Sequence, residues 1–143
     1  MQINRTASAQ WSGGLKDGKG QISTQSGALK AQPYGFATRF EGVVGTNPEE
    51  LIGAAHAGCF TMALSLILGE AGLTAESMET EAKVTLEKVD DGFAITAIHL
   101  KLHGKVPGTD EATFVGLANK AKAGCPVSKA LAAVPITLDV TFG

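Results

Sequence analysis

The feature that most constrains this chain of 143 residues is an uncharged stretch from Leu51 to Gly69. Asn47, Pro48 and two glutamates precede it, an order typical of a soluble helix start, with asparagine as the N-cap and acids in the first turn. The stretch is long enough to span a membrane. Because it contains histidine, cysteine, threonine and serine and has no flanking lysine or arginine, we predict a buried core helix and no membrane association.

Two pairs of small residues lie one turn apart in this predicted helix, Gly53 with Ala57 and Ala54 with Gly58. Small side chains allow another backbone to approach closely, which favours a helix that crosses a neighbouring helix. Charged residues make up only 18% of the chain, below the roughly 25% usual for soluble domains. A small chain has much surface to cover. We therefore predict that part of the surface is covered by another subunit, with this helix at the seam.

Composition excludes other classes of protein. The 12 basic and 14 acidic residues leave no positive excess to bind nucleic acid, and a hydrophobic share of 44% argues against disorder. The length is that of a single domain, residues 1–143. No apolar run follows Arg5, so we expect no secretory signal, a cytoplasmic location, and reduced thiols at Cys59 and Cys125.

The remaining elements follow from alternation and capping. The strand-like pieces are Arg5–Trp11, Gly20–Ser23, Ala37–Val44, Thr80–Lys88, Phe93–His103 and Pro135–Phe142. Asp90-Asp91-Gly92 is typical of a hairpin turn, and a change of phase near Thr96 indicates a β-bulge or a strand buried on both faces. The order of strands and helices predicts an α+β fold with mostly antiparallel sheets around the long helix.

Cys125 follows a predicted helix that Thr109-Asp110-Glu111 caps and Gly124 ends, and it precedes Pro126, which begins a short helix over Val127–Ala133. A thiol at a helix start meets unpaired N–H groups that lower its pKa, but a buried cysteine can also be an inert cap.

Cys59 lies in the middle of the long helix, where a cysteine is commonly a small core residue. A cation is needed to activate it, and Arg39 is the nearest in the sequence, although a surface role on its strand also explains Arg39. Glu49 is accounted for as a first-turn acid. It lies ten residues before Cys59, about 15 Å in one straight helix, and approaches Cys59 only if two copies of the helix cross antiparallel.

His56 and Cys59 share one helix face at a spacing of three residues, which permits a cysteine–histidine nucleophile pair or two metal ligands. Two further ligands would have to come from Cys125, His99, His103 or a carboxylate, and the two histidines are explained by a solvated strand. The chain has no Cys-x-x-Cys motif. We therefore expect no metal site.

Three segments in chain order carry a resemblance to a known family: Gln32–Phe40, Thr46–Leu64 and Ala121–Ser128, with Asp90–Thr96 as a further match. Together they resemble the osmotically inducible protein C (OsmC) family, whose relatives include the organic hydroperoxide resistance proteins. The resemblance implies an OsmC-like fold, an intertwined homodimer with its active sites at the subunit boundary, and a thiol peroxidase that needs no cofactor. Its substrates would be organic hydroperoxides and, less efficiently, hydrogen peroxide, and an external dithiol would be its reductant.

By the same resemblance, Cys59 is the peroxidatic cysteine and Cys125 the resolving one, Arg39 stabilises the Cys59 thiolate, and Glu49 holds Arg39. Helix capping alone would make Cys125 the attacking thiol. We follow the resemblance, because contact with a guanidinium group can outweigh a helix dipole, and a low pKa at Cys125 suits a leaving group when the disulfide is reduced. The expected apolar walls of the site are Phe36, Phe40 and Phe60.

Two other classes of function remain open at this stage. Cys59 and His56 are also the parts of a cysteine–histidine hydrolase or acyltransferase, which would hydrolyse activated esters in the absence of peroxide. A non-enzymatic dimer that binds a small ligand would make both cysteines dispensable.

Overall fold

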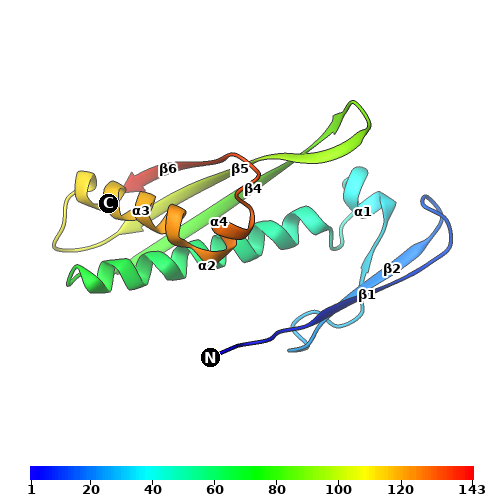
Figure 1. Cartoon of the computed structure of the whole chain (residues 1–143), viewed down its shortest axis with the longest axis horizontal. Coiled ribbons are helices and arrows are strands. Elements are labelled where there is room, and N and C mark those ends of the chain that lie inside the picture. The colour runs from blue at the N-terminus through cyan, green and yellow to red at the C-terminus, as the bar shows by residue number, and fades with distance from the viewer. The chain divides into compact units, whose positions relative to one another are not determined.

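The computed structural model describes all 143 residues, and they divide into two compact units, Met1–Leu51 and Ile52–Gly143. Figure 1 shows the elements of each unit along the chain. The expectation of one domain over residues 1–143 stays a prediction.

The first unit contains an antiparallel sheet in the order β1-β2-β3, formed by Ala7–Ser12, Lys19–Thr24 and Gln32–Tyr34. Gly20 in the central strand lies beneath the rings of Trp11 and Tyr34, whose centroids are 5.5 Å apart. A Cβ at this position would collide with both rings, so glycine is what allows them to pack there. The first two expected strands are confirmed.

The expected strand over Ala37–Val44 is wrong, because the chain forms the short helix α1, Phe36–Phe40. The Gly35 N–H donates to Oγ1 of Thr38 at 2.9 Å, and that hydroxyl donates back to the Gly35 carbonyl at 3.0 Å, which starts the helix. Phe36 and Phe40 stack with centroids 4.9 Å apart. Over five residues, positions i and i+4 share a face in a helix as well as in a strand, so the alternation did not distinguish the two.

Helix α2 runs from Pro48 to Glu70 and begins as predicted, because the Glu50 N–H donates to Oδ1 of Asn47 at 2.8 Å. By length and a mean hydropathy of 1.8 it passes the test for a membrane span. Within this chain it buries one face, on which Phe60, Leu64 and Leu68 are fully enclosed in the core. This is the pattern of a core helix. The other face is open, however, so the chain alone does not bury the helix all round.

The small residues of α2 divide between its faces. A Cβ on Gly53 would lie 3.3 Å from the carbonyl oxygen of Ala82, so this glycine allows the helix to approach the sheet of its own chain. Gly58 has nothing within 4 Å of such a Cβ. Of these two glycines, Gly53 is therefore the one that serves close packing within the chain.

The second sheet has the order β4-β5-β6, formed by Ser77–Val89, Gly92–Lys105 and Ile136–Phe142. β4 and β5 form the predicted antiparallel hairpin, and β6 adds to β5 in parallel. The predicted β-bulge is confirmed, because Thr85 pairs with Ala97 while Leu86 pairs with Ile95, which leaves Thr96 as the extra residue.

The helices α3, Glu111–Gly124, and α4, Pro126–Ala130, complete the second unit. The predicted cap of α3 is present, with the Thr113 N–H donating to Oδ1 of Asp110 at 2.8 Å. α2, α3 and one face of the sheet share a single hydrophobic core: Phe60, Leu64, Leu68, Ile98, Leu100, Leu102, Phe114, Ala118 and Ala121. Cys125 lies in this core at the junction of α3 and α4.

Candidate functional site

The two cysteines, 66 residues apart in the sequence, lie side by side in the second unit. The sulfur of Cys59, in the middle of α2, is 2.7 Å from the sulfur of Cys125. Both are free thiols, with Cys125 buried and Cys59 partly exposed. A disulfide bond measures about 2.05 Å. A small shift is thus enough to join the two sulfurs, with Cys59 as the one within reach of solvent.

The end of one helix and the start of the next place Cys125. Its N–H donates to the Ala121 carbonyl at 2.9 Å, closing α3, and its extended backbone then turns into α4, with Pro126 in the first turn. The expectation of a cysteine at the N-cap of a short helix is confirmed.

The surroundings shift the pKa values of the two thiols in opposite directions. Burial raises the pKa of Cys125, but hydrogen bonds from the Cys59 side chain and from Ser128 outweigh this effect and hold the pKa below its ordinary value. Burial raises the pKa of the Cys59 thiol, and the hydrogen bond with Cys125 and the charge there raise it further. No cationic side chain of the second unit contributes to either pKa. Within this unit, Cys125 is therefore the more acidic thiol, as its helix-start position predicted.

Arg39 and Glu49 form a bidentate ion pair in the first unit. Nε of Arg39 donates to Oε1 of Glu49 at 3.0 Å, and Nη2 donates to Oε2 at 2.9 Å. The Glu49 side chain is 12% exposed and that of Arg39 36%. Two parallel hydrogen bonds fix the plane of a guanidinium group as well as its charge. The four expected site residues thus form two contacting pairs, one in each unit.

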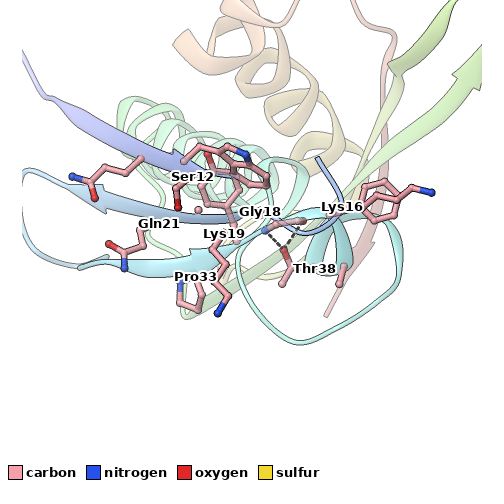
Figure 2. A pocket seen from close by; sticks show the side chains of 14 residues that line it. Ser12, Lys16, Gly18, Lys19, Gln21, Pro33 and Thr38 are labelled. Carbon is pink, nitrogen blue, oxygen red and sulfur yellow. Dashed lines mark hydrogen bonds between the residues drawn. The ribbon is translucent and has the colours of Figure 1, made fainter. Parts of the chain in front are cut away.

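Two hollows lie in the first unit. The larger, about 820 Å³, opens over β1, β2 and the start of α1, with Ser12, Lys19, Gln21 and Pro33 among its lining (Figure 2). The smaller, about 230 Å³, is mostly apolar and is lined by Trp11, Leu15, Tyr34, Gly35, Phe36, Arg39, Phe40 and Pro48. The expected wall residues Phe36 and Phe40 thus lie beside Arg39. Phe60, the third, is fully enclosed in the core and lines neither hollow, so that expectation is wrong.

Comparisons with known proteins decide the family. Residues 40–139 match the family described as OsmC-like protein. The chain is 63% identical over 139 residues to Peroxiredoxin OsmC of Escherichia coli (strain K12). These aligned residues cover 97% of this chain and 96% of that protein. The chain belongs to the OsmC-like protein family. The resemblance drawn from its motifs is confirmed, and so is the expected enzyme class, a peroxidase.

Other relatives and solved structures agree on the OsmC-like fold. The organic hydroperoxide resistance protein OhrB of Bacillus subtilis is 35% identical over 113 residues, which cover 78% of this chain and 80% of that protein. The crystal structure of OhrB superposes with a TM-score of 0.72 at 31% identity, covering 95% of this chain and 98% of that one. A structure from Legionella pneumophila gives the same TM-score at 26% identity, covering 98% and 99%. The expected α+β OsmC-like fold is confirmed.

His56 of this OsmC-like chain does not form the cysteine–histidine pair that its spacing permitted. The imidazole is buried, and its Nε2 lies 2.7 Å from Oγ of Ser128, whereas no hydrogen bond joins it to Cys59. Burial lowers the pKa of His56, which keeps the ring neutral. Sequence reasoning missed Ser128. Its position three residues after Cys125, within the last family motif, was the available signal.

The other two histidines lie apart from the cysteines. His99 contacts Thr137 at 2.6 Å and Asp139 at 3.2 Å, and His103 contacts the Gly143 carbonyl at 2.8 Å. Nowhere in the chain do three or more histidine, cysteine, aspartate or glutamate side chains gather in a way that could hold a metal ion.

Proposed function

We propose that this chain reduces organic hydroperoxides, and hydrogen peroxide less efficiently, through a cycle in which Cys59 and Cys125 alternate between thiols and a disulfide. The observation that carries the proposal is the 2.7 Å separation of the two sulfurs. Support comes from the names of its relatives, a peroxiredoxin and several organic hydroperoxide resistance proteins.

The cycle has three steps. The Cys59 thiolate attacks the distal oxygen of the peroxide, the O–O bond breaks, and the alkoxide takes a proton and leaves as an alcohol. The resulting Cys59 sulfenic acid is attacked by the Cys125 thiolate. An S–S bond forms, the S–O bond breaks, and the departing hydroxide takes a proton to become water. An external dithiol then donates two electrons by thiol–disulfide exchange and restores both thiols.

The first step requires Cys59 to be a thiolate, although its surroundings in the second unit raise its pKa. A nearby cation favours the charged form. We assign this role to Arg39, with Glu49 holding the guanidinium group in plane. The ten-residue spacing of Glu49 and Cys59, about 15 Å along a straight helix, favours the Arg39–Glu49 pair of a second copy.

The apolar hollow beside Arg39 fits the alkyl part of the substrate. Phe36 and Phe40 line it together with Trp11, Leu15 and Tyr34, so an alkyl chain there leaves water while its peroxide group stays near the guanidinium. This arrangement favours organic hydroperoxides over hydrogen peroxide, which has no apolar part to bury.

The proposed homodimer is supported by the open face of α2. Met62 and Leu66 are 75% and 65% exposed there, and Gly58 leaves room for a close approach. Leu66→Glu is expected to shift the chain from dimer to monomer in multi-angle light scattering, because it places a charge in an apolar seam. Val44→Glu, at an exposed apolar position before α2, is the matched control and leaves the mass unchanged. A wild-type monomer with full activity would contradict the dimer.

A cytoplasmic location belongs to the same proposal. The cycle consumes one dithiol equivalent in each turnover, and that compartment keeps thiols reduced. Fractionation of cells that produce the protein, with detection by antibody, tests the location.

Mass spectrometry after one equivalent of tert-butyl hydroperoxide tests the chemistry. The wild-type chain is expected to lose two hydrogen atoms and to yield a peptide bridged between Cys59 and Cys125. Cys125→Ser should instead gain one oxygen atom on Cys59 and stop there, and Cys59→Ser should leave the peroxide unconsumed. Full turnover by Cys59→Ser, or a wild-type chain without the bridge, overturns the proposal. An ester hydrolase would react without peroxide, but the engagement of His56 with Ser128 disfavours that function.

A further inference from the structure

The two hollows of the first unit adjoin each other, because four residues line both: Trp11, Tyr34, Gly35 and Phe36. The rest of their linings differ. The smaller, mostly apolar hollow includes Arg39. The larger includes two lysines, Lys16 and Lys19 (Figure 2). The proposed function uses the smaller hollow and leaves the lysines of the larger one without a role.

A row of contacts connects Lys16 to Arg39. Nζ of Lys16 lies 5.7 Å from the ring centroid of Phe36, and that ring stacks on Phe40 with centroids 4.9 Å apart. Cζ of Arg39 in turn lies 5.5 Å from the ring centroid of Phe40. A cation within about 6 Å of an aromatic ring is attracted to it. Two stacked rings of the first unit therefore connect one positive charge to the other.

The charge around the two hollows is positive. Neither hollow has an aspartate or glutamate in its lining. The charge of Arg39 is compensated by Glu49, whereas Lys16 is exposed and takes part in no ion pair. Asp17, the acid next to it in the chain, accepts a hydrogen bond from the Gly14 N–H at 3.0 Å. Lys16 is thus an uncompensated cation beside an apolar wall, which is a suitable partner for an anionic group.

We propose that Lys16 is a specificity-determining residue, which binds a carboxylate at the far end of an organic hydroperoxide while the peroxide group lies near Arg39. The part of the substrate between the two groups packs against Phe36 and Phe40. An unpaired ammonium group attracts a carboxylate more strongly than a guanidinium group already paired with Glu49, so the charges orient the substrate. The carboxylate itself takes no part in the two-cysteine cycle. This inference rests on the proposed function and names a substrate class for it.

A matched pair of substrates tests the inference: cumene hydroperoxide, which is neutral, and its para-carboxylated analogue. The measured quantity is the ratio of the two kcat/KM values, carboxylate over neutral. Lys16→Met should lower this ratio about threefold to fivefold, the size expected for one exposed ion pair. Lys16→Arg keeps the charge and should keep most of the ratio. Thermal unfolding of each variant shows whether it is folded.

Lys30→Met is the matched control. It removes the same charge from an exposed lysine of the first unit that lines neither hollow. The ratio should therefore stay at the wild-type value. A fall equal to that of Lys16→Met would show an effect of net charge and would overturn the inference.

Salt provides a readout that a change in the shape of the hollow would not produce. Raising the ionic strength should lower the wild-type ratio toward the ratio of Lys16→Met, because ions screen an exposed charge pair. The ratio of Lys16→Met should depend less on salt. Equal salt dependence in the two proteins would contradict a charge contact at Lys16.

Binding of the two alcohol products tests the site without any peroxide chemistry. Cumyl alcohol and its para-carboxylated analogue are each titrated into the full chain and followed by nuclear magnetic resonance. The wild-type chain should bind the carboxylated alcohol more tightly than the neutral one. Lys16→Met should remove most of this difference, and Lys30→Met should retain it.

Two results of these measurements overturn the inference. One is a carboxylated alcohol that binds the wild-type chain no more tightly than the neutral alcohol. The other is a kinetic ratio that Lys16→Met leaves at the wild-type value. If the alcohols bind as expected but the wild-type chain reduces neither hydroperoxide, the carboxylate site stands and the proposed function fails. The two proposals are therefore tested separately.

Discussion

The two units of the chain differ sharply in how many of their residues are buried. In Met1–Leu51, Gly20 is the only buried residue, and every residue of β1 is exposed. In Ile52–Gly143, helices and one sheet face enclose a continuous apolar core. The difference concerns the site directly, because the thiols belong to the well-packed unit and the Arg39–Glu49 pair to the open one.

This division matches the demands of the proposed chemistry. Two sulfurs that must meet within bonding distance need a rigid frame, and close-packed cores provide one. A guanidinium group that meets an incoming peroxide needs access to solvent. Arg39 has that access at 36% exposure, while the bidentate bond to Glu49 limits its freedom.

The largest expected effect tests whether the core of the second unit carries most of the stability. Phe60→Ala should lower the free energy of unfolding by about 3–5 kcal/mol, because it leaves a cavity in the core. Trp11→Ala, at a residue 40% exposed in the first unit, is the control and should cost clearly less. Urea unfolding of both variants gives the two values. Equal losses would show that the two units depend on each other for stability.

The next effect concerns the proposed role of the open unit in catalysis. Arg39→Met should slow the reaction of Cys59 with tert-butyl hydroperoxide by about tenfold to a hundredfold, the loss expected when one or two pKa units of thiolate stabilisation disappear. Arg39→Lys keeps the charge but loses the bidentate bond, so its rate should lie between the rates of the wild type and of Arg39→Met. Stopped-flow measurement of peroxide loss provides the rates. An unchanged rate in Arg39→Met would remove Arg39 from the site.

A third effect depends on pH and belongs to the well-packed unit. Burial lowers the pKa of His56 in the folded state, so the unfolded chain binds its proton more readily. The folded state, which holds His56 neutral, therefore keeps its full stability above the unfolded pKa of about 6.5. It loses stability as the pH falls toward the folded pKa, because the unfolded chain then binds the proton. Between pH 6.5 and 5, wild-type stability should fall more steeply than that of His56→Gln, by at most about 1.4 kcal/mol per pH unit. Parallel curves from urea unfolding would contradict this.

The smallest effect distinguishes the contribution of the Arg39–Glu49 pair to the free energy of unfolding from its role in peroxide reduction. Glu49→Gln should change the free energy of unfolding by about 1 kcal/mol or less, because a partly exposed ion pair is screened by solvent. The same variant should slow peroxide reduction, since the guanidinium group loses its second fixed bond. A large stability loss with unaltered peroxide reduction would make the pair structural.

Where sequence reasoning succeeded, the relevant contacts are short-range. The caps at Asn47 and Asp110 each involve an N–H three residues away, and the hairpin turn and its bulge lie within one pair of adjacent strands. The error at Phe36–Phe40 has the same origin. An alternation over five residues is compatible with a helix as well as with a strand. The hydrogen bonds between Gly35 and Thr38 stabilise the helix here.

The sequence by itself determined the α+β class and the family, because caps, alternation and motifs are local or matched residue by residue. The roles of the four expected site residues stay predictions. The resemblance already paired the two cysteines with each other and Glu49 with Arg39, but only the tertiary structure shows the distances at which side chains meet. The Cys59–Cys125 contact spans 66 residues and the His56–Ser128 contact spans 72. Such pairings depend on how α2 and the α3–α4 junction pack into one core, and no local pattern encodes that geometry. Packing also placed Phe60 in the core and left Phe36 and Phe40 beside the guanidinium group of Arg39.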